Sequence, residues 1–298
     1  MSNTLASIRN KIGGAEDLRS VVRTMKSVAA ANIGQYQKSV IALNDYNRSV
    51  ELGLSVCFSS LNAKSLTLNH KLKTSQSNIS AIIFGSDQGL VGQFNDVVSN
   101  YAIKALSNLP LKPKVWAVGT RVHARMISRG VNPTGQFPLP ESIQSISSLV
   151  GKILIEVLKA QGEDTALYLF YNQPKSASGY EPTCIQLLPL NQKWRKRLTA
   201  LKWPSTTLPE VIGDHTQTLR ALIREYLFVS LFRAAAESLA SENASRLAAM
   251  QRADKNIDEL LDNLNRNFHR FRQNSIDEEL FDVISGYDAL TLNKKAVG

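Results

Sequence analysis

The fold is decided by residues 219–290, which read LRALIREYLFVSLFRAAAESLASENASRLAAMQRADKNIDELLDNLNRNFHRFRQNSIDEELFDVISGYDAL. This stretch holds no proline, and its one glycine, Gly286, lies near its end. Apolar residues recur in steps of three and four, which places them on one face of an α-helix. A continuous helix of this extent would be on the order of 100 Å long. We therefore expect its apolar face to pair with a second long helix.

The N-terminal segment has the pattern that such a partner needs. From Leu5 to Leu54, apolar residues again recur in steps of three and four, and this predicts a helix of about fifty residues, roughly 80 Å long. Gly13 and Gly14 should weaken this helix by about 1 kcal/mol each, and we expect a kink or a close helix crossing there. The residues predicted to pack between the two helices are Met25, Ala29, Leu247, Met250, Ile257, Leu261, Leu264 and Phe268.

The middle of the chain alternates short apolar runs with helical patterns. We predict strands at 79–84, 115–118, 166–170 and 184–188, and helices at 96–109, 121–129 and 143–161. This order favours a small Rossmann-like α/β domain with a mainly parallel sheet, inserted between two long terminal helices that form an antiparallel coiled coil. The predicted boundaries are 1–58 for the N-terminal helix, 59–78 for a connector, 79–208 for the α/β domain and 209–298 for the C-terminal helix.

Composition narrows the class of protein without choosing a function. The chain has a net charge of +10, which suits nucleic acid, an anionic membrane or an acidic protein partner. Its two cysteines, Cys57 and Cys184, lie far apart, as expected for a reducing compartment. No apolar run is long enough for a transmembrane helix, and the N-terminus lacks the apolar core of a signal peptide.

Motifs for catalysis, metals and cofactors are missing from the sequence. The four histidines, His70, His123, His215 and His269, show no metal-binding spacing. The stretch GSDQGLVGQFN (85–95) follows a predicted strand, as a dinucleotide loop would, but it matches neither GxGxxG nor a P-loop. We therefore expect a structural turn supported by Asp87, Gly89, Gly92 and Asn95, with no catalytic residue, metal or cofactor.

Three blocks of sequence resemble the gamma subunit of F-type ATP synthases. They are RTMKSVAAA (23–31), GSDQGLVGQFN (85–95), and ASENASRLAAM (240–250) followed by RQNSI (272–276). The chain departs from the family pattern at Gln88, Val91 and Gln93, where Arg, Cys and Gly are usual, and at Asp277, where Thr is common. These departures indicate a divergent branch, such as an alternate bacterial form.

The resemblance implies a non-catalytic rotor shaft that couples an ion-driven c-ring to the catalytic beta subunits. The implied partners are the alpha, beta and epsilon subunits and the c-ring, with no nucleic acid and no direct membrane insertion. The implied location is peripheral, on the cytoplasmic side of a bacterial inner membrane. The residues expected to contact the stator are Met25, Lys26, Arg272, Gln273 and Asp277.

Two other hypotheses compete with a rotor. One is a coiled-coil adaptor that binds nucleic acid through its positive charge, and salt-dependent DNA binding would support it. Against it, basic and aromatic residues do not interleave as in a nucleic-acid-binding surface. The other is a nucleotide-binding enzyme built on the α/β domain, which nucleotide titration would test.

Overall fold

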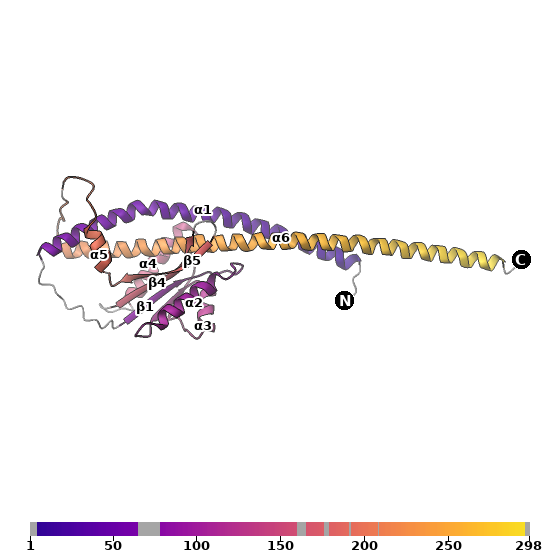
Figure 1. Cartoon of the computed structure of the whole chain (residues 1–298), viewed down its shortest axis with the longest axis horizontal. Coiled ribbons are helices and arrows are strands. Elements are labelled where there is room, and N and C mark those ends of the chain that lie inside the picture. The colour runs from indigo at the N-terminus through magenta and orange to yellow at the C-terminus, as the bar shows by residue number, and fades with distance from the viewer. Residues whose placement is uncertain are drawn as a thin grey trace. The chain divides into compact units, whose positions relative to one another are not determined.

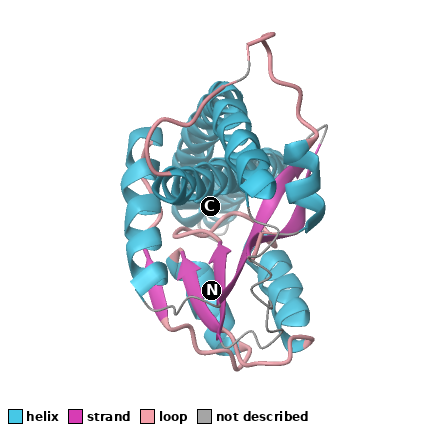
Figure 2. Cartoon of the chain, turned by 90° about the vertical axis from the view of Figure 1, so that its left-hand side faces the viewer, coloured by secondary structure: helices cyan, strands magenta, loops and turns pink. Residues whose placement is uncertain are grey.

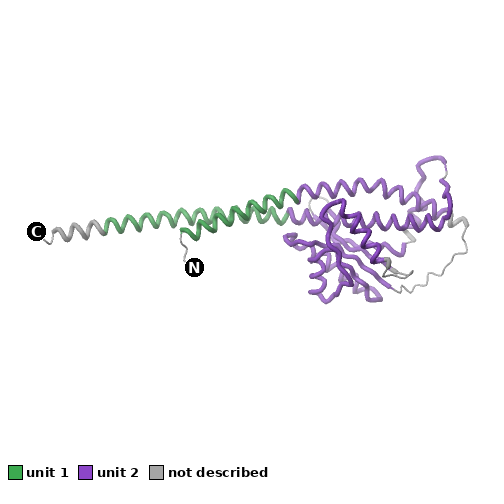
Figure 3. The backbone as a smooth tube through the Cα atoms, turned by 180° about the vertical axis from the view of Figure 1, so that it is seen from behind, with its two compact units in different colours: residues 1–28, 248–298 green, residues 29–247 purple. Residues whose placement is uncertain are grey.

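A computed structural model describes residues 5–64, 78–159, 165–175, 179–190, 192–207 and 209–295. Its elements, labelled in Figure 1 where there is room, are six helices and five strands in that part of the chain: α1 Leu5–Lys64, β1 Asn78–Phe84, α2 Phe94–Ser107, β2 Lys114–Val118, α3 Thr120–Ser128, β3 Gly135–Phe137, α4 Ile143–Lys159, β4 Thr165–Lys175, β5 Gly179–Leu188, α5 Gln192–Thr199 and α6 His215–Lys295. The chain divides into two compact units (Figure 3), which are residues 1–28 with 248–298, and residues 29–247.

The larger unit contains the sheet (Figure 2), with strand order β3-β2-β1-β4-β5. β1 pairs in parallel with β2 and with β4, so that Ile82 lies opposite Trp116 on one side and Leu169 on the other. β5 pairs antiparallel with β4 along the whole of its length. The prediction of a mainly parallel sheet is therefore confirmed, with one antiparallel edge.

Alternation along β1 gives the sheet two apolar faces, since successive side chains of a strand point to opposite sides. Ile82 and Phe84 belong to a core with α4, with α6 residues between Leu227 and Ala240, and with Tyr36 of α1. Ala81 and Ile83 belong to a second core with residues of α2 and α3. A strand buried on both faces reads as a continuous apolar run, which is why β1 was easy to predict.

The long helices run antiparallel within this unit. Asn32 of α1 lies beside Asn243 of α6, while Tyr46, further along α1, donates a 2.7 Å hydrogen bond to Glu225, earlier in α6. A third apolar cluster joins Val50, Leu54 and Phe58 of α1 to Leu198 of α5, with Trp194 and Tyr226 packed against it.

The smaller unit contains the other ends of the same two helices, and here too they run antiparallel. Arg19 lies 2.7 Å from Asp258 and Lys26 lies 2.9 Å from Asp254. The antiparallel helix pair predicted from the apolar stripes is thus found in each unit separately.

Gly13 and Gly14 do not mark a close helix crossing. α1 is helical throughout Leu5–Lys64, and a Cβ atom built on either glycine would meet nothing within 4 Å. Of the two expectations for this pair, the close crossing is wrong, because nothing approaches a Cβ placed on either glycine, and the kink stays a prediction.

Several boundaries differ from the sequence-based prediction. α1 continues to Lys64, past the predicted end at residue 58, and the predicted 79–208 region contains two elements beyond those predicted, β3 and α5. β3 has only three residues and α5 only eight, too few for a clear periodic pattern. α6 begins at His215, where Asp214 accepts a hydrogen bond from the Thr216 amide and caps the helix. Residues 65–77 of the predicted connector lie outside the described residues.

None of the helices in the described part of the chain is both long and apolar enough to cross a membrane.

Candidate functional site

The strand order creates one position where α/β proteins commonly bind ligands. α2 and α3 carry the chain from β1 outward to β2 and β3, and α4 carries it back across to β4 on the other side of β1. In such doubly wound sheets the ligand crevice lies beyond the carboxyl ends of the two strands where the order reverses. Here these are β1 and β4, so the loop after β1, residues 85–93, is the place to look for a site.

Close packing of the backbone defines this loop. A Cβ atom on Gly85 would lie 2.3 Å from Cβ of Val122, and one on Gly119 would lie 2.8 Å from the Ser86 carbonyl oxygen. Gly119 also has a φ of +113°, which side chains disfavour. The two glycines therefore let the starts of the loop and of α3 touch.

Asn95 and Ser86 fix the loop by a reciprocal pair of hydrogen bonds. The Asn95 side-chain oxygen accepts from the Ser86 amide at 2.9 Å, and its amide group donates to the Ser86 hydroxyl at 2.8 Å. Asn95 is one of the residues predicted to support this loop, and these are its contacts there.

Asp87 ties three segments together through its carboxylate. One oxygen accepts from the Thr120 amide at 2.7 Å and the other from the Leu139 amide at 2.8 Å. Thr120 is the first residue of α3, whose own cap residue, Gly119, offers no side chain. Asp87 therefore supplies the N-terminal cap of α3 from a distant part of the sequence, where a negative charge also favours the helix dipole.

Gly89 and Gly92 are the other two residues predicted to support this loop. They differ in whether their backbone conformation favours glycine. Gly92 has a φ of +56°, whereas a Cβ on Gly89 would make only an ordinary contact, 3.6 Å from Arg121. Leu90 also has a positive φ, of 62°, although it is not a glycine, and its side chain is 61% exposed.

α6 and β4 bond to this loop and to the start of α2. The Ser245 hydroxyl donates a 2.6 Å hydrogen bond to the Val91 carbonyl, and Asn172 of β4 donates to the Phe94 carbonyl at 3.0 Å. The Phe94 ring packs edge-on against Tyr180. The groups that meet at this position are thus protein groups from β4, β5 and α6.

The same part of α6 carries a buried charged pair. Arg246 lies 2.6 Å from Glu242, one turn earlier, and both side chains are largely shielded from solvent. Burial raises the pKa of Glu242, while Arg246 acts in the opposite direction and the charge of Asp87 adds to the rise. One turn before this pair, Glu237 accepts a hydrogen bond from Tyr171 of β4, and burial raises its pKa as well.

Lys26, expected to contact a stator, has a partner within its own chain. Its Nζ lies 2.9 Å from Asp254 Oδ2, and Arg23 lies 3.6 Å from Oδ1 of the same carboxylate. These neighbours, led by the hydrogen bond from Lys26, lower the pKa of Asp254.

The remaining predicted contact residues fall into two groups. Arg272, Gln273 and Asp277 are exposed on α6, whereas Met25 is half-buried on α1. In the same part of α6, large apolar side chains are exposed, which are Ile276, Leu280, Phe281, Val283 and Ile284. This end of α6 therefore presents both charge and apolar surface to solvent within its unit.

The residues predicted to pack between the helices are all at least half-buried. Ala29, Met250 and Leu261 are buried, and Met25, Leu247, Ile257, Leu264 and Phe268 are half-buried. Leu18 and Leu260 also fall at helical spacing in these two segments but are exposed, because a straight periodic count drifts around the helix surface over many turns.

No group of three or more His, Cys, Asp or Glu able to hold a metal is present among the described residues. Cys57 and Cys184 are free thiols, and burial raises the pKa of each, that of Cys184 to about 11. A raised pKa keeps a thiol protonated and unreactive at neutral pH. Neither cysteine has the environment of a nucleophile.

Sequence reasoning missed four of the residues that organise these contacts. Gly85 and Gly119 follow predicted strands, but only the close contacts that a Cβ atom would make there show that both positions require glycine. Ser245 and Asp254 looked like ordinary polar residues of a helix. Their partners lie more than a hundred residues away, and no local pattern signals such contacts.

Comparisons with known proteins agree on one family. The ATP synthase family model matches residues 4–290. A gamma chain of ATP synthase from Anaeromyxobacter sp. (strain Fw109-5) is 26% identical over 96% of this chain and 99% of its own length. The gamma chain from Rhizobium rhizogenes (strain K84 / ATCC BAA-868) is 25% identical with the same coverage.

Solved structures show the same fold at lower identity. A chain of the Euglena gracilis mitochondrial ATP synthase rotor aligns with a TM-score of 0.62 at 16% identity, over 91% of this chain and 98% of that one. A chain of the Tetrahymena thermophila mitochondrial ATP synthase central stalk and c-ring aligns with a TM-score of 0.58 at 20% identity, over 78% and 99%.

Proposed function

Since this chain belongs to the ATP synthase family, as a relative of its gamma chains, we propose that it is the central rotor shaft of a rotary F-type ATP synthase. The observation that carries the proposal is the match over nearly the whole chain, 96% of it against a gamma chain of which 99% is covered. The antiparallel pairing of α1 with α6 in each unit gives the stiffness that a shaft needs. Its partners are the alpha and beta subunits and the c-ring.

The role that we propose is mechanical, with ATP chemistry left to the beta subunits. The loop after β1 and the start of α2 are bonded to the chain itself, by Ser245 at the Val91 carbonyl and by Asn172 at the Phe94 carbonyl. The loop there lacks a Gly-rich phosphate motif. These observations favour a shaft over a nucleotide-binding enzyme, and titration with ATP and ADP should give no saturable binding to the isolated chain.

We propose that the exposed part of α6 around Arg272, Gln273 and Asp277 contacts the stator. An arginine presents a planar fork of donors that matches carboxylates. Met25 and Lys26 are proposed as contacts on α1, with Lys26 shared between Asp254 and any stator carboxylate. We also propose that an epsilon subunit is a further partner. The proposed location is peripheral, on the cytoplasmic face of a bacterial inner membrane.

Copurification tests the rotor role directly. A tagged form of the chain should recover alpha, beta and c subunits from membranes solubilised in mild detergent. It should also raise the ATPase activity of purified alpha and beta subunits when it is added to them. Recovery of the chain alone, with no effect on that ATPase, would contradict the proposal. Recovery of nucleic acid that is lost as salt rises would favour an adaptor.

A further inference from the structure

A basic segment that contains tryptophan joins β5 to α6, and none of its residues is among the proposed stator contacts. Residues 192–209 hold Lys193, Arg195, Lys196, Arg197 and Lys202 and no acidic residue. The segment forms α5 and then a loop, which projects away from the long helices at the top of Figure 2. Every residue of the loop from 200 to 207 is exposed. This part of the larger unit therefore presents a basic surface to solvent.

Part of this charge is engaged within the chain and part of it is free. Arg197 lies 3.0 Å from Glu51, and the two charges offset each other. Arg195 lies over an aromatic ring of α1, 5.0 Å from its centre, and its guanidinium remains charged and exposed. Lys196 and Lys202 are exposed, and neither ammonium group has a partner among the residues that the structure describes. Arg195, Lys196 and Lys202 are therefore available to bind a partner.

The two acids that follow the basic run do not neutralise it. Asp214 caps α6 through the Thr216 amide, where the positive end of the helix dipole lies beside it. Glu210 is exposed and comes after the acid-free run has ended. The available cations of this segment therefore outnumber its available carboxylate.

Large apolar side chains lie in the same projecting loop. Leu201 is 37% exposed, Trp203 is 36% exposed and Ile212 is 94% exposed. In α5, by contrast, Leu198 is fully buried against α1, so the apolar side chains of the loop are not simply the edge of that cluster. A tryptophan ring has an apolar body and one N–H donor, and such side chains are enriched where lipid meets water. Trp203 directly follows Lys202, which places an apolar group and a cation side by side.

The geometry points to an anionic lipid surface as the partner of this segment. Leu201 and Trp203 enter the headgroup layer, while Arg195, Lys196 and Lys202 lie against the anionic headgroups. Clusters of Lys and Arg attract anionic lipids, and apolar side chains beside them hold a protein at headgroup depth without a spanning helix. A projecting loop suits a fluid layer that closes around it, whereas a folded protein partner would need a matching cavity. The contact does not depend on the rotor role.

Lipid vesicles provide the probe. The full chain is mixed with vesicles of phosphatidylcholine alone, or with vesicles in which about 30% of the lipid is phosphatidylglycerol, and the bound fraction is measured by sedimentation. We expect binding to the vesicles that contain phosphatidylglycerol and little binding to phosphatidylcholine alone. Raising KCl from about 0.1 to 0.5 M should weaken the binding, because salt screens exposed charges.

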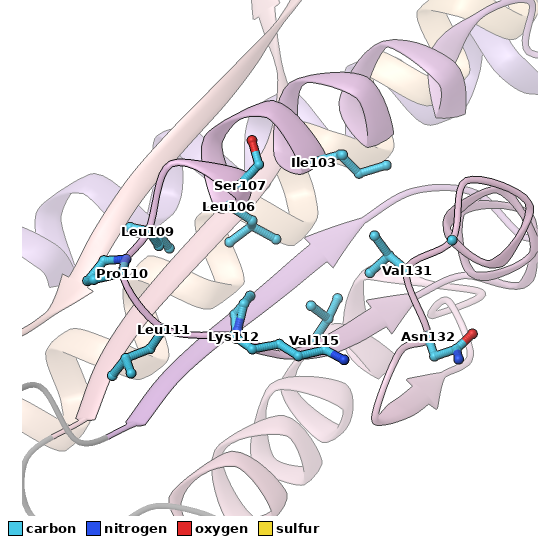
Figure 4. Close-up of a pocket in the computed structure, with 12 residues that line it drawn as sticks. Ile103, Leu106, Ser107, Leu109, Pro110, Leu111, Lys112, Val115, Val131 and Asn132 are labelled. Carbon is cyan, nitrogen blue, oxygen red and sulfur yellow. The ribbon is translucent and has the colours of Figure 1, made fainter.

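Paired lysine substitutions separate this surface from the net charge of the chain. Lys196→Gln with Lys202→Gln should weaken binding to the anionic vesicles roughly thirtyfold, since two cations are removed from the lipid contact. Lys104→Gln with Lys112→Gln changes the net charge equally and is the matched control. Both control lysines are exposed, and Lys112 lines an open hollow beside α2 (Figure 4), away from α5. The control variant should bind like the unaltered chain.

Fluorescence locates the contact within the chain. Vesicles with brominated acyl chains quench a tryptophan that reaches them, and they should quench Trp203. Trp116 is buried and Trp194 is half-buried, so neither should be quenched. Trp203→Phe keeps an aromatic ring and should therefore still bind, but its remaining fluorescence should no longer respond to the brominated vesicles. Ile127→Ser, at an exposed position of α3, should bind and be quenched like the unaltered chain.

Four outcomes would overturn the inference. They are an absence of preference for the anionic vesicles, equal weakening by the two lysine pairs, and quenching that persists in Trp203→Phe. In the fourth, purified c subunits in neutral detergent shield Trp203 from iodide while vesicles do not, which would make the segment a protein contact. None of these results decides whether the chain copurifies with alpha, beta and c subunits, so the rotor role is judged separately.

Discussion

Lys26 Nζ lies 2.9 Å from Asp254 Oδ2, which joins α1 to α6 within the unit formed by residues 1–28 and 248–298. Arg23 and Arg19 add positive charge near the same carboxylate. The contact makes Lys26 part of the pairing between the helices, whether or not it also meets a stator.

The first prediction separates these two roles of Lys26. Asp254→Asn removes the carboxylate and leaves Lys26 free, whereas Lys26→Ala removes the cation. If Lys26 acts only between the helices, both variants should lower the melting temperature and change coupled ATPase turnover equally. If Lys26 also bonds a stator carboxylate, Lys26→Ala should lower turnover further than Asp254→Asn does.

This contact should also depend on pH. The lowered pKa of Asp254 means that its contribution to stability is present above the ordinary value of 3.8 and is lost as pH falls through the lower, folded value. The melting temperatures of the wild-type chain and Asp254→Asn should therefore differ at pH 7 and converge below that value. A difference that persisted in strong acid would contradict the assignment.

Glu237 should show the opposite dependence. Burial raises its pKa, so its contribution is fully present below the unfolded value and is lost as pH rises through the folded one. Glu237→Gln keeps an acceptor for the Tyr171 hydroxyl and removes the buried charge. It should melt higher than wild type at pH 7 and no higher at pH 4. Glu156→Gln, at an exposed position of α4, should melt like wild type at both.

Asp87 should be needed for the start of α3. Asp87→Ala leaves the amides of Thr120 and Leu139 without their acceptor and should lower the free energy of unfolding by about 2–3 kcal/mol. Hydrogen exchange of these two amides should accelerate locally, before global unfolding. Glu141→Gln, an exposed acid without a described partner of this kind, should leave both amides protected. Unchanged exchange in Asp87→Ala would show that the cap is not made in solution.

Replacing glycine by alanine should change the free energy of unfolding in opposite directions at two positions. Gly13→Ala adds a side chain into open space on a helix and should raise the free energy of unfolding by about 1 kcal/mol. Gly85→Ala would place Cβ 2.3 Å from Val122 and should lower it by about 3 kcal/mol or disrupt the domain. Denaturant titration of the full chain measures both, and a neutral Gly85→Ala would refute the close packing of the loop.

Arg272→Ala should lower coupled ATPase turnover while assembly stays intact. A charge-assisted bond made in one rotary position contributes about 1.5–3 kcal/mol, so its loss at the step that limits turnover should lower turnover roughly 10- to 150-fold. Asp277→Thr should have a milder effect. Arg220→Ala, an exposed arginine near the start of the same helix, is the matched control. Equal turnover in Arg272→Ala and wild type, at low and high salt, would remove this contact from the proposal.

Much of the fold follows from local pattern. The long helices repeat apolar residues at helical spacing over many turns. The buried strand 79–84 is a short apolar run interrupted only by Ser80. β3 is too short to carry such a signal, and α5, with Lys196 and Arg197 in its last turn, reads as a basic linker. Leu260 is exposed although the neighbouring Leu261 is buried. Periodicity therefore locates a helix better than it identifies which of its residues are buried.

The site was harder to predict because its contacts join distant segments. Asp87 and Asn95 could be named from the loop motif, but Thr120 and Leu139, the distant partners of Asp87, could not. The pairing of Lys26 with Asp254 spans most of the chain, and a basic residue on a helix looks the same in sequence whether it faces water, a partner or its own carboxylate.

The hydrogen bond from Ser245 to Val91 joins α6 to the loop after β1, beside the position where other proteins of this topology keep a small molecule. A small molecule leaves when its concentration falls, but a tethered helix stays at a high effective concentration however dilute the protein is. The loop after β1 therefore stays attached to α6 without any bound molecule. A force applied to α6 in this unit would pass into the α/β domain through Ser245, with nothing that has to be bound or released in each cycle.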